Sequence, residues 1–226
     1  MMVPRLLYFA SRNPKLMEAE FPKRWRQHGA LGMSMARWRN VSLYVQCDRV
    51  DGPDTGVPEL SCDGVAIVRF RSEEARLSHI GDREASAIMK ADERETFAQP
   101  VREVSVLSDI QEGLDDEIGP LKFFMCVRRS SGGSVDRFHA DWTTRITRPM
   151  TAALQAHSIA FSHNQNVARP DFPDAATGPY CDLVEEFDCT DPAAFANSVR
   201  SILSGCPVEL ASFTAVWTAP RVLHRA

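Results

Sequence analysis

The chain has 226 residues, of which 44% are hydrophobic and 25% are charged, and this composition is typical of a globular protein rather than a disordered or collagen-like chain. At about 150 residues per domain, the length predicts one or two domains. The 26 Lys and Arg and the 30 Asp and Glu give a net charge of −4 without a long basic run, so a nucleic acid is not an expected partner.

In the first half of the chain, apolar patterns predict the order β-α-β-β-α-β. Compact or alternating apolar runs are typical of strands, and they cover residues 6–10, 40–46, 63–70 and 101–107. Phe21 and Trp25 lie four residues apart, a spacing that puts both side chains on one face of a helix. Ser72 is a typical N-cap residue and indicates where a second helix begins.

The second half repeats these features. Phe138 and Trp142 restore the aromatic pair 117 residues further on (138 − 21 = 117), and we expect both pairs to belong to the core rather than to a ligand site. Strands are predicted at residues 121–127, 159–165, 180–187 and 211–217. Ser134 and Asp191 are N-cap candidates for the two helices. The acidic, glycine-containing segment 110–120 predicts a linker.

The repeated order is that of the ferredoxin-like split βαβ unit. Helices cover one face of such a four-stranded sheet, so the other, apolar face must be buried against a partner. The second copy supplies that partner. We therefore predict an α+β protein with two domains, residues 1–112 and 113–226.

Several of these residues match the pattern of a known family. The chain resembles two fused EthD domains of the dimeric α+β barrel superfamily. In the first half the matching pieces are Phe21-x3-Trp25-x2-His28, Tyr44-Val45-Gln46, residues 63–70, and Ala91-Asp92-Glu93 with Phe97. The second half departs from the pattern at Arg145, where the family has His, and at Cys181, where the first half has Gly64. The resemblance implies that the two antiparallel sheets close a fused, pseudo-dimeric barrel whose lumen is the pocket.

Charged residues are predicted to point into this lumen. If Phe70 and Phe187 face the helices, alternation places Arg69 in one wall and Asp182 with Glu186 in the other. A buried charge is costly unless it is paired, which favours an ion pair from Arg69 to Glu186 or Asp182. The alternative is that Arg69 orients an anionic or carbonyl substrate, because its planar fork suits carboxylate or enolate oxygens.

Further polar residues are candidates for proton transfer and hydrogen bonding. His28 lies towards the end of its predicted helix, where the helix dipole favours the protonated imidazole; it is either a proton shuttle or a histidine that hydrogen-bonds a free carbonyl. Tyr44, Gln46, His163 and Gln165 occupy alternating strand positions. They either donate hydrogen bonds to a developing oxyanion or are polar edge residues.

Motifs for cofactors and export are missing from the sequence. It has no GxGxxG, P-loop, GxSxG or HExxH pattern, so neither a cofactor nor a metal is expected. Haem stays open as an alternative, because the superfamily includes haem enzymes. The chain has no apolar run long enough for a membrane span and no signal-peptide pattern. The six cysteines lack CxxC spacing and are expected to be reduced, which predicts a cytoplasmic protein.

Two functional hypotheses follow. The first is a cofactor-independent lyase, isomerase or cyclase acting on a hydrophobic carbonyl or aromatic-type metabolite. Its catalytic residues would be His28, Tyr44 and Arg69, and its substrate-binding residues Gln46, His163, Gln165, Asp182 and Glu186. The second is a non-catalytic small-molecule-binding or accessory protein that supports a degradative oxygenase system. Either protein would take a small apolar or aromatic molecule, as a monomer with a pseudo-dimeric barrel or as a homodimer.

Overall fold

A computed structural model describes residues 3–110, 119–130, 134–159, 161–169, 180–205 and 211–226. Most of the predicted linker, and the predicted boundary between residues 112 and 113, lie outside these ranges. In the first half the elements are β1 (Val3–Ala10), α1 (Phe21–Met33), β2 (Val41–Arg49), β3 (Gly64–Phe70), α2 (Glu73–Gly81), α3 (Arg83–Thr96) and β4 (Ser105–Ile110). Short 3-10 turns cover Glu18–Glu20, Ala36–Asn40 and Val101–Val104.

The second half has the same order of strands. Its elements are β5 (Leu121–Arg129), α4 (Val135–Trp142), a π-helical turn (Thr143–Thr147), α5 (Arg148–Ala156), β6 (Phe161–Val167), β7 (Leu183–Cys189), α6 (Pro192–Leu203) and β8 (Ala211–Arg225). The predicted N-caps are confirmed, since the side chains of Ser72, Ser134 and Asp191 accept hydrogen bonds from backbone amides three residues on.

The chain departs from the predicted elements in two places of the first half. The helix after Ser72 is broken into α2 and α3, because Asp82 accepts a hydrogen bond from the Ala85 amide and caps a new helix. The apolar stretch 101–107 begins as a 3-10 turn, and β4 starts only at Ser105. Both changes lie on the same side of the first half, where they shape the surface described below.

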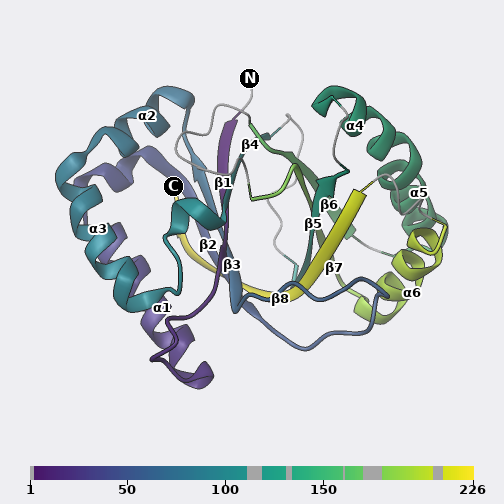
Figure 1. Cartoon of the computed structure of the whole chain (residues 1–226), viewed down its shortest axis with the longest axis horizontal. Coiled ribbons are helices and arrows are strands. Elements are labelled where there is room, and N and C mark those ends of the chain that lie inside the picture. Colours follow the sequence, from purple (N-terminus) through teal and green to yellow (C-terminus); the bar gives the residue numbers. More distant parts are fainter. Residues whose placement is uncertain (1–2, 111–118, 131–133, 160, 170–179, 206–210) are drawn as a thin grey trace.

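The eight strands form a single antiparallel sheet in the order β4-β1-β3-β2-β8-β5-β7-β6. The 15-residue β8 joins the halves, because its first part pairs with β5 and its second part with β2. At the other side, Ser108 of β4 bridges Ala168 after β6, and the Arg169 amide donates to the Leu107 carbonyl at 2.8 Å. The sheet is therefore a nearly closed barrel, with α1–α3 outside one half and α4–α6 outside the other (Figure 1).

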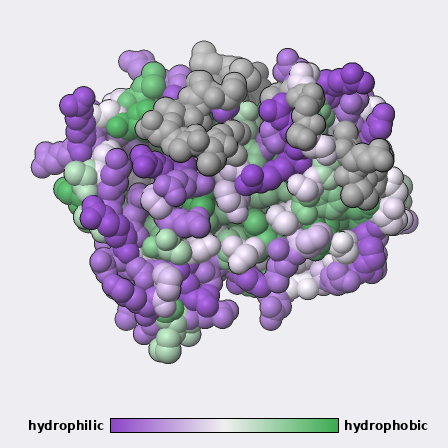
Figure 2. All heavy atoms as spheres, in the orientation of Figure 1, coloured by the Kyte–Doolittle hydropathy of each residue, from purple (hydrophilic) through white to green (hydrophobic). Residues whose placement is uncertain are grey.

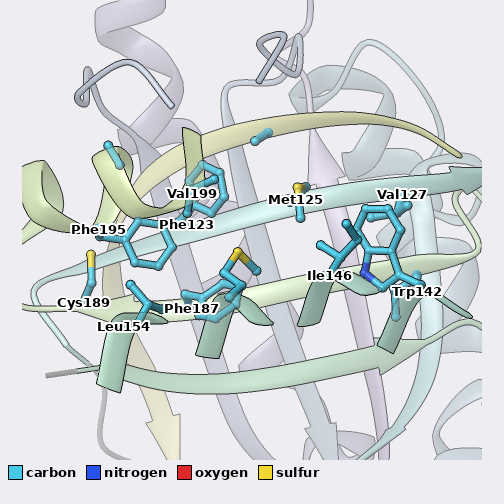
Figure 3. Packing of buried hydrophobic residues seen from close by; sticks show 14 of the residues in the cluster. Phe123, Met125, Val127, Trp142, Ile146, Leu154, Phe187, Cys189, Phe195 and Val199 are labelled. Carbon is cyan, nitrogen blue, oxygen red and sulfur yellow. The ribbon is translucent and has the colours of Figure 1, made fainter. Parts of the chain in front are cut away.

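Strand alternation separates the barrel interior from the helix layers, as predicted. Ala66, Val68 and Phe70 of β3 pack with the first aromatic pair, whereas Val65 and Ile67 point inside the barrel. The rings of Phe21 and Trp25 stack at 5.4 Å. On the other side, Phe138 and Trp142 join the core between the second half of the sheet and its helices. Figure 3 shows Trp142 in this core, near Ile146 and Val127.

The surface is mainly polar on the face shown in Figure 2, where hydrophobic residues form small patches. Large apolar side chains that are exposed include Leu77 and Ile80 of α2 and Ile88 of α3. None of the described helices is both long and apolar enough to span a lipid bilayer.

Candidate functional site

The barrel interior, where the pocket was expected, is largely filled in the described part of the chain. Its apolar side chains are Leu7, Phe9, Leu43, Val45, Val65, Ile67, Val106, Phe124, Val184 and Val216, with the thiols of Cys47 and Cys126 among them. A small cavity of about 120 Å³ lies beside Cys126 and Tyr180. The packed side chains make the interior a core of the protein.

A buried ion cluster also occupies the interior. The Glu186 carboxylate contacts Arg5 Nη2 at 2.6 Å and Lys122 Nζ at 2.8 Å, and Lys122 also pairs with Asp188. Arg5, Lys122 and Glu186 are at most 5% exposed. Burial would raise the pKa of Glu186, but the two cations outweigh it and hold the pKa below its ordinary value. Glu186 is therefore an ionised partner of Arg5 and Lys122.

The predicted partner of Glu186 was wrong. Arg69 lies in register with Arg5 on the neighbouring strand, but its Nε donates to Ser42 Oγ at 3.2 Å. Asp182 pairs instead with Arg129, at 3.2 Å from Nε. The physical reason is that Lys122 reaches Glu186 from the neighbouring strand β5 and Arg5 reaches it from β1, which does not pair with β7. Alternation within β3 carries no information about those strands.

Tyr44 and Gln46 belong to a buried hydrogen-bond network between β2 and α1. Gln46 Nε2 donates to Tyr44 Oη at 2.5 Å and to the Trp25 carbonyl at 3.1 Å. Tyr44 Oη lies 3.2 Å from Tyr8 Oη, which accepts from Trp25 Nε1 at 3.0 Å. Tyr44 and Gln46 are at most 2% exposed, so the polar-edge interpretation is wrong for both. Their role as oxyanion donors remains a prediction.

His28 lies in the middle of α1, and its environment differs from the one expected. Its Nδ1 is 2.7 Å from Asp92 Oδ2 of α3, and its ring meets Phe97 edge-on at 5.0 Å. Burial lowers the pKa of His28, and the Asp92 carboxylate offsets this only in part. The expectation of a dipole-favoured imidazolium is therefore wrong, because α1 continues to Met33 and desolvation dominates.

His163 and Gln165 surround a buried carboxylate in the second half. Glu185 is fully buried and accepts from His163 Nε2 at 2.5 Å, Trp142 Nε1 at 2.8 Å, Thr147 Oγ1 at 2.5 Å and Gln165 Nε2 at 3.2 Å. Burial would raise the pKa of Glu185, but these donors lower it. Glu185 thus accepts the hydrogen bonds of polar side chains between the second helix layer and the sheet. In the first half, the hydroxyls of Tyr8 and Tyr44 take this role.

An apolar hollow that described residues line lies beside α2 and α3. It is an open cavity of about 630 Å³ between these helices, the 3-10 turn at Val101–Val104, and β1. Its apolar walls include Leu6, Ile80, Phe97 and Val101. Cavities of this size and character are typical small-molecule sites. The family resemblance predicts the pocket in the barrel lumen instead.

The polar groups of this cavity were also missed as site residues. Glu93 lines it from α3, and burial raises the pKa of this carboxyl. Arg37 contributes a guanidinium whose Nη1 donates to Ser86 Oγ at 2.9 Å, while its buried Nε has no partner in the described chain. His79 completes the set, with Nδ1 3.1 Å from the Arg37 carbonyl and a pKa that burial lowers to about 4.

One sequence signal could have identified Glu93. Met89, Glu93 and Phe97 follow each other at four-residue spacing, which places a carboxyl in an apolar helix stripe. Arg37 and His79 give no comparable signal, because their position at the cavity depends on how the 3-10 turn Ala36–Asn40 packs against α2.

A second hollow, of about 740 Å³, lies near Ser11 and Asp63. It is mostly polar, and its arginines are already paired, Arg12 with Asp63 and Arg49 with Glu59. It therefore offers fewer free polar groups and less apolar surface than the cavity beside α2 and α3.

The described residues show no built site for a metal ion or for a histidine-bound haem. They contain no group of three or more His, Cys, Asp or Glu side chains that could hold a metal ion. A histidine that binds haem iron needs a ring nitrogen open to a cavity. Among the histidines of the described chain, His79 alone lines one of the cavities above. His79 is 9% exposed, and its ring packs edge-on against Trp38 and Phe70.

Comparison with known proteins gives a family match for part of the first half and shows the fold. Residues 13–100 match the EthD domain family. A structure of a putative chlorite dismutase has a TM-score of 0.59 at 8% identity, over 98% of this chain and 95% of the other. A mutant chlorite dismutase from Candidatus Nitrospira defluvii gives 0.57 at 10% identity, over 97% and 90%. A putative monooxygenase from Fusobacterium nucleatum subsp. nucleatum gives 0.55 at 10% identity, over 98% and 93%. A search of curated proteins gave no match.

Proposed function

We propose that the cavity beside α2 and α3 is the functional site of this chain, whose residues 13–100 match the EthD domain family and whose fold is a dimeric α+β barrel. In this proposal the protein is a cofactor-independent enzyme of the lyase, isomerase or cyclase type that acts on a hydrophobic carbonyl compound. One observation carries the proposal: Glu93, which lies within the EthD match and whose pKa is raised by burial, lines an apolar cavity. A carboxyl with a raised pKa is suited to general acid–base catalysis near neutral pH.

The chemistry requires two groups. The Glu93 carboxylate removes a proton from the carbon next to the substrate carbonyl, and the electron pair of that C–H bond moves to form an enolate. The guanidinium of Arg37, which lines the same cavity, stabilises the negative oxygen. Glu93 then returns the proton, to the same carbon or to another carbon of the enolate system. The step needs neither an oxidant nor a metal.

His28 enters this proposal as a positioning residue. It bonds Asp92, the neighbour of Glu93 on α3, and its ring contacts Phe97, which lines the cavity. Tyr44, Gln46, His163 and Gln165 belong to hydrogen-bond networks, and in this proposal they stabilise the helix layers rather than touch the substrate.

The experiment measures proton exchange, which requires no knowledge of the natural product. Purified protein is incubated in D2O with 4-phenylbutan-2-one, and NMR follows loss of the protons next to the carbonyl. We expect the wild-type protein to accelerate exchange above buffer, and Glu93→Gln to reduce the acceleration by about 10²-fold or more. Glu95→Gln is the matched control, because Glu95 is an exposed acid of the same helix. Equal exchange rates for E93Q and wild type would remove Glu93 from the mechanism.

The second candidate is a non-catalytic binding or accessory protein for an oxygenase system. The observation that favours it is the contact from the Val101 amide to Glu93 Oε2, at 3.4 Å, which fits a carboxylate that holds the 3-10 turn. This candidate predicts that 4-phenylbutan-2-one binds and leaves unchanged, with no exchange above buffer, and that E93Q binds it as the wild type does.

A further inference from the structure

The charge around the cavity is strongly one-sided. The cationic residues that line it are Arg37, Lys90, Arg94 and Arg102. They come from the 3-10 turn Ala36–Asn40, from α3 and from the 3-10 turn Val101–Val104. Glu93 is the one acid among the described lining residues, and burial raises its pKa. Three segments that are separate in sequence therefore bring an excess of positive charge to one apolar hollow.

These four cations are not held in salt bridges by carboxylates of the described chain, although Glu93 lies near enough for Lys90, Arg37 and Arg102 to lower its pKa against the effect of burial. No salt bridge joins any of the four to a carboxylate within the residues that the structure describes, although Arg24 of the neighbouring α1 pairs with Asp92 at 2.6 Å. Arg94 Nε donates to the Lys90 carbonyl at 3.3 Å, which holds its chain along α3 beside Lys90. The outer cations thus remain available to a ligand, while Arg37 lies deeper, half-buried against Ser86.

We propose that the natural ligand of this cavity is an apolar carboxylic acid, with its carboxylate at Lys90, Arg94 and Arg102 and its apolar body against Leu6 and Phe97. This inference rests on the proposed function for its site and names its substrate class. The combination of an apolar wall and a basic rim matches an amphipathic anion, because the wall takes up the apolar body and the cations attract the head group. Arginine side chains suit a carboxylate in particular, since their planar fork can donate two parallel hydrogen bonds.

The two ends of the substrate then lie in different parts of the cavity. The carboxylate at the exposed rim leaves the interior of the cavity for the apolar body and for the carbonyl that Arg37 and Glu93 address. The substrate class is therefore an apolar acid that carries a second, reactive carbonyl group away from its carboxylate. A neutral ketone of the same size would lack the rim contact and bind more weakly.

The experiment compares two probes of equal chain length by isothermal titration calorimetry, octanoate and octan-1-ol. We expect the wild-type protein to bind octanoate at least about tenfold more tightly than octanol. The double variant K90A/R102A should bring the two affinities within about twofold of each other by weakening octanoate alone. Arg83→Ala is the matched control, because Arg83 is an exposed cation of α3 that does not line the cavity, and it should retain the preference. Raising NaCl from 0.05 to 0.5 M should weaken octanoate binding more than octanol binding.

Each outcome separates this inference from the proposed function. Equal affinities of the wild-type protein for octanoate and octanol would overturn the carboxylate inference and leave the apolar site intact. A preference for octanoate that survives in K90A/R102A would also overturn it, because the anion would then be held elsewhere. Failure of both probes, together with absence of 4-phenylbutan-2-one binding, would overturn the cavity as the functional site and the inference with it.

Discussion

Replacing Glu186 by Gln tests whether the ion cluster inside the barrel stabilises the fold. The cluster contains two cations, Arg5 and Lys122, and two anions, Glu186 and Asp188, so its charges balance. Glutamine keeps the shape of the side chain and one oxygen but removes the negative charge, which leaves one positive charge uncompensated in a dry interior. Removing one partner of a buried ion pair costs about 3–5 kcal/mol.

The structure sets the expected loss at the lower end of that range, about 3 kcal/mol, because two contacts survive. Lys122 keeps Asp188, and Arg5 Nη1 keeps its hydrogen bond to Asn166 Oδ1 at 3.2 Å. Urea unfolding at pH 7, followed by tryptophan fluorescence, measures the loss. With a urea dependence of about 2 kcal/mol per molar, the midpoint should fall by about 1.5 M.

A matched control and a pH series complete this test. Glu59→Gln removes the acid of an exposed pair with Arg49, and it should cost less than about 0.5 kcal/mol. Because the folded-state pKa of Glu186 lies below its ordinary value, the advantage of the wild type is present above about pH 4.5 and is lost as the pH falls towards the folded pKa. A loss in E186Q no larger than that in E59Q would refute the reasoning.

Three further predictions concern the first half. The folded-state pKa of His79 is about 4, against 6.5 in the unfolded chain. Between these pH values the unfolded state binds the extra proton, so the free energy of unfolding should fall by about 3 kcal/mol from pH 6.5 to pH 4. His79→Gln should flatten that part of the curve of unfolding free energy against pH. A Cβ at Gly64 would lie 2.6 Å from the Cys47 carbonyl, so Gly64→Ala should cost at least about 1–3 kcal/mol in urea unfolding, whereas Gly81→Ala, with no atom within 4 Å, should cost nothing. His28→Ala should lower the free energy of unfolding by about 1–3 kcal/mol and slow proton exchange less than tenfold; a loss of about 10²-fold in a folded variant would make His28 the acid–base group.

Part of the fold could be predicted because its signals are local. Each aromatic pair marks the buried face of one helix. Ser72 and Ser134 accept hydrogen bonds from backbone amides only three residues away. Such patterns depend on neighbouring residues of the same element, so they survive whatever the element packs against. The break at Asp82 follows the same rule, because Asp82 caps α3 by accepting from the Ala85 amide three residues on.

The candidate site was harder to predict because its contacts are distant in sequence. His28 was singled out as a titrating group, but its protonation depends on burial and on Asp92, 64 positions further along the chain. Glu186 was correctly placed inside the barrel, yet its partners come from β1 and β5. The energy of an ion pair depends on which charged side chains come together after folding. Alternation along one strand shows which face a side chain lies on but does not show its partner on another strand.

The sequence by itself determined the order of the elements, the faces of the strands and, through the bare apolar face of each sheet, the association of the two halves. Hydrophobic burial is nearly independent of the exact partner, which is why periodicity sufficed for this level. Only the tertiary structure decided that the barrel interior is packed and that the hollow lies beside α2 and α3. The position of a cavity depends on how side-chain volumes from separate segments fill space, and Arg37, His79 and Glu93 meet there only because the 3-10 turn, α2 and α3 pack together.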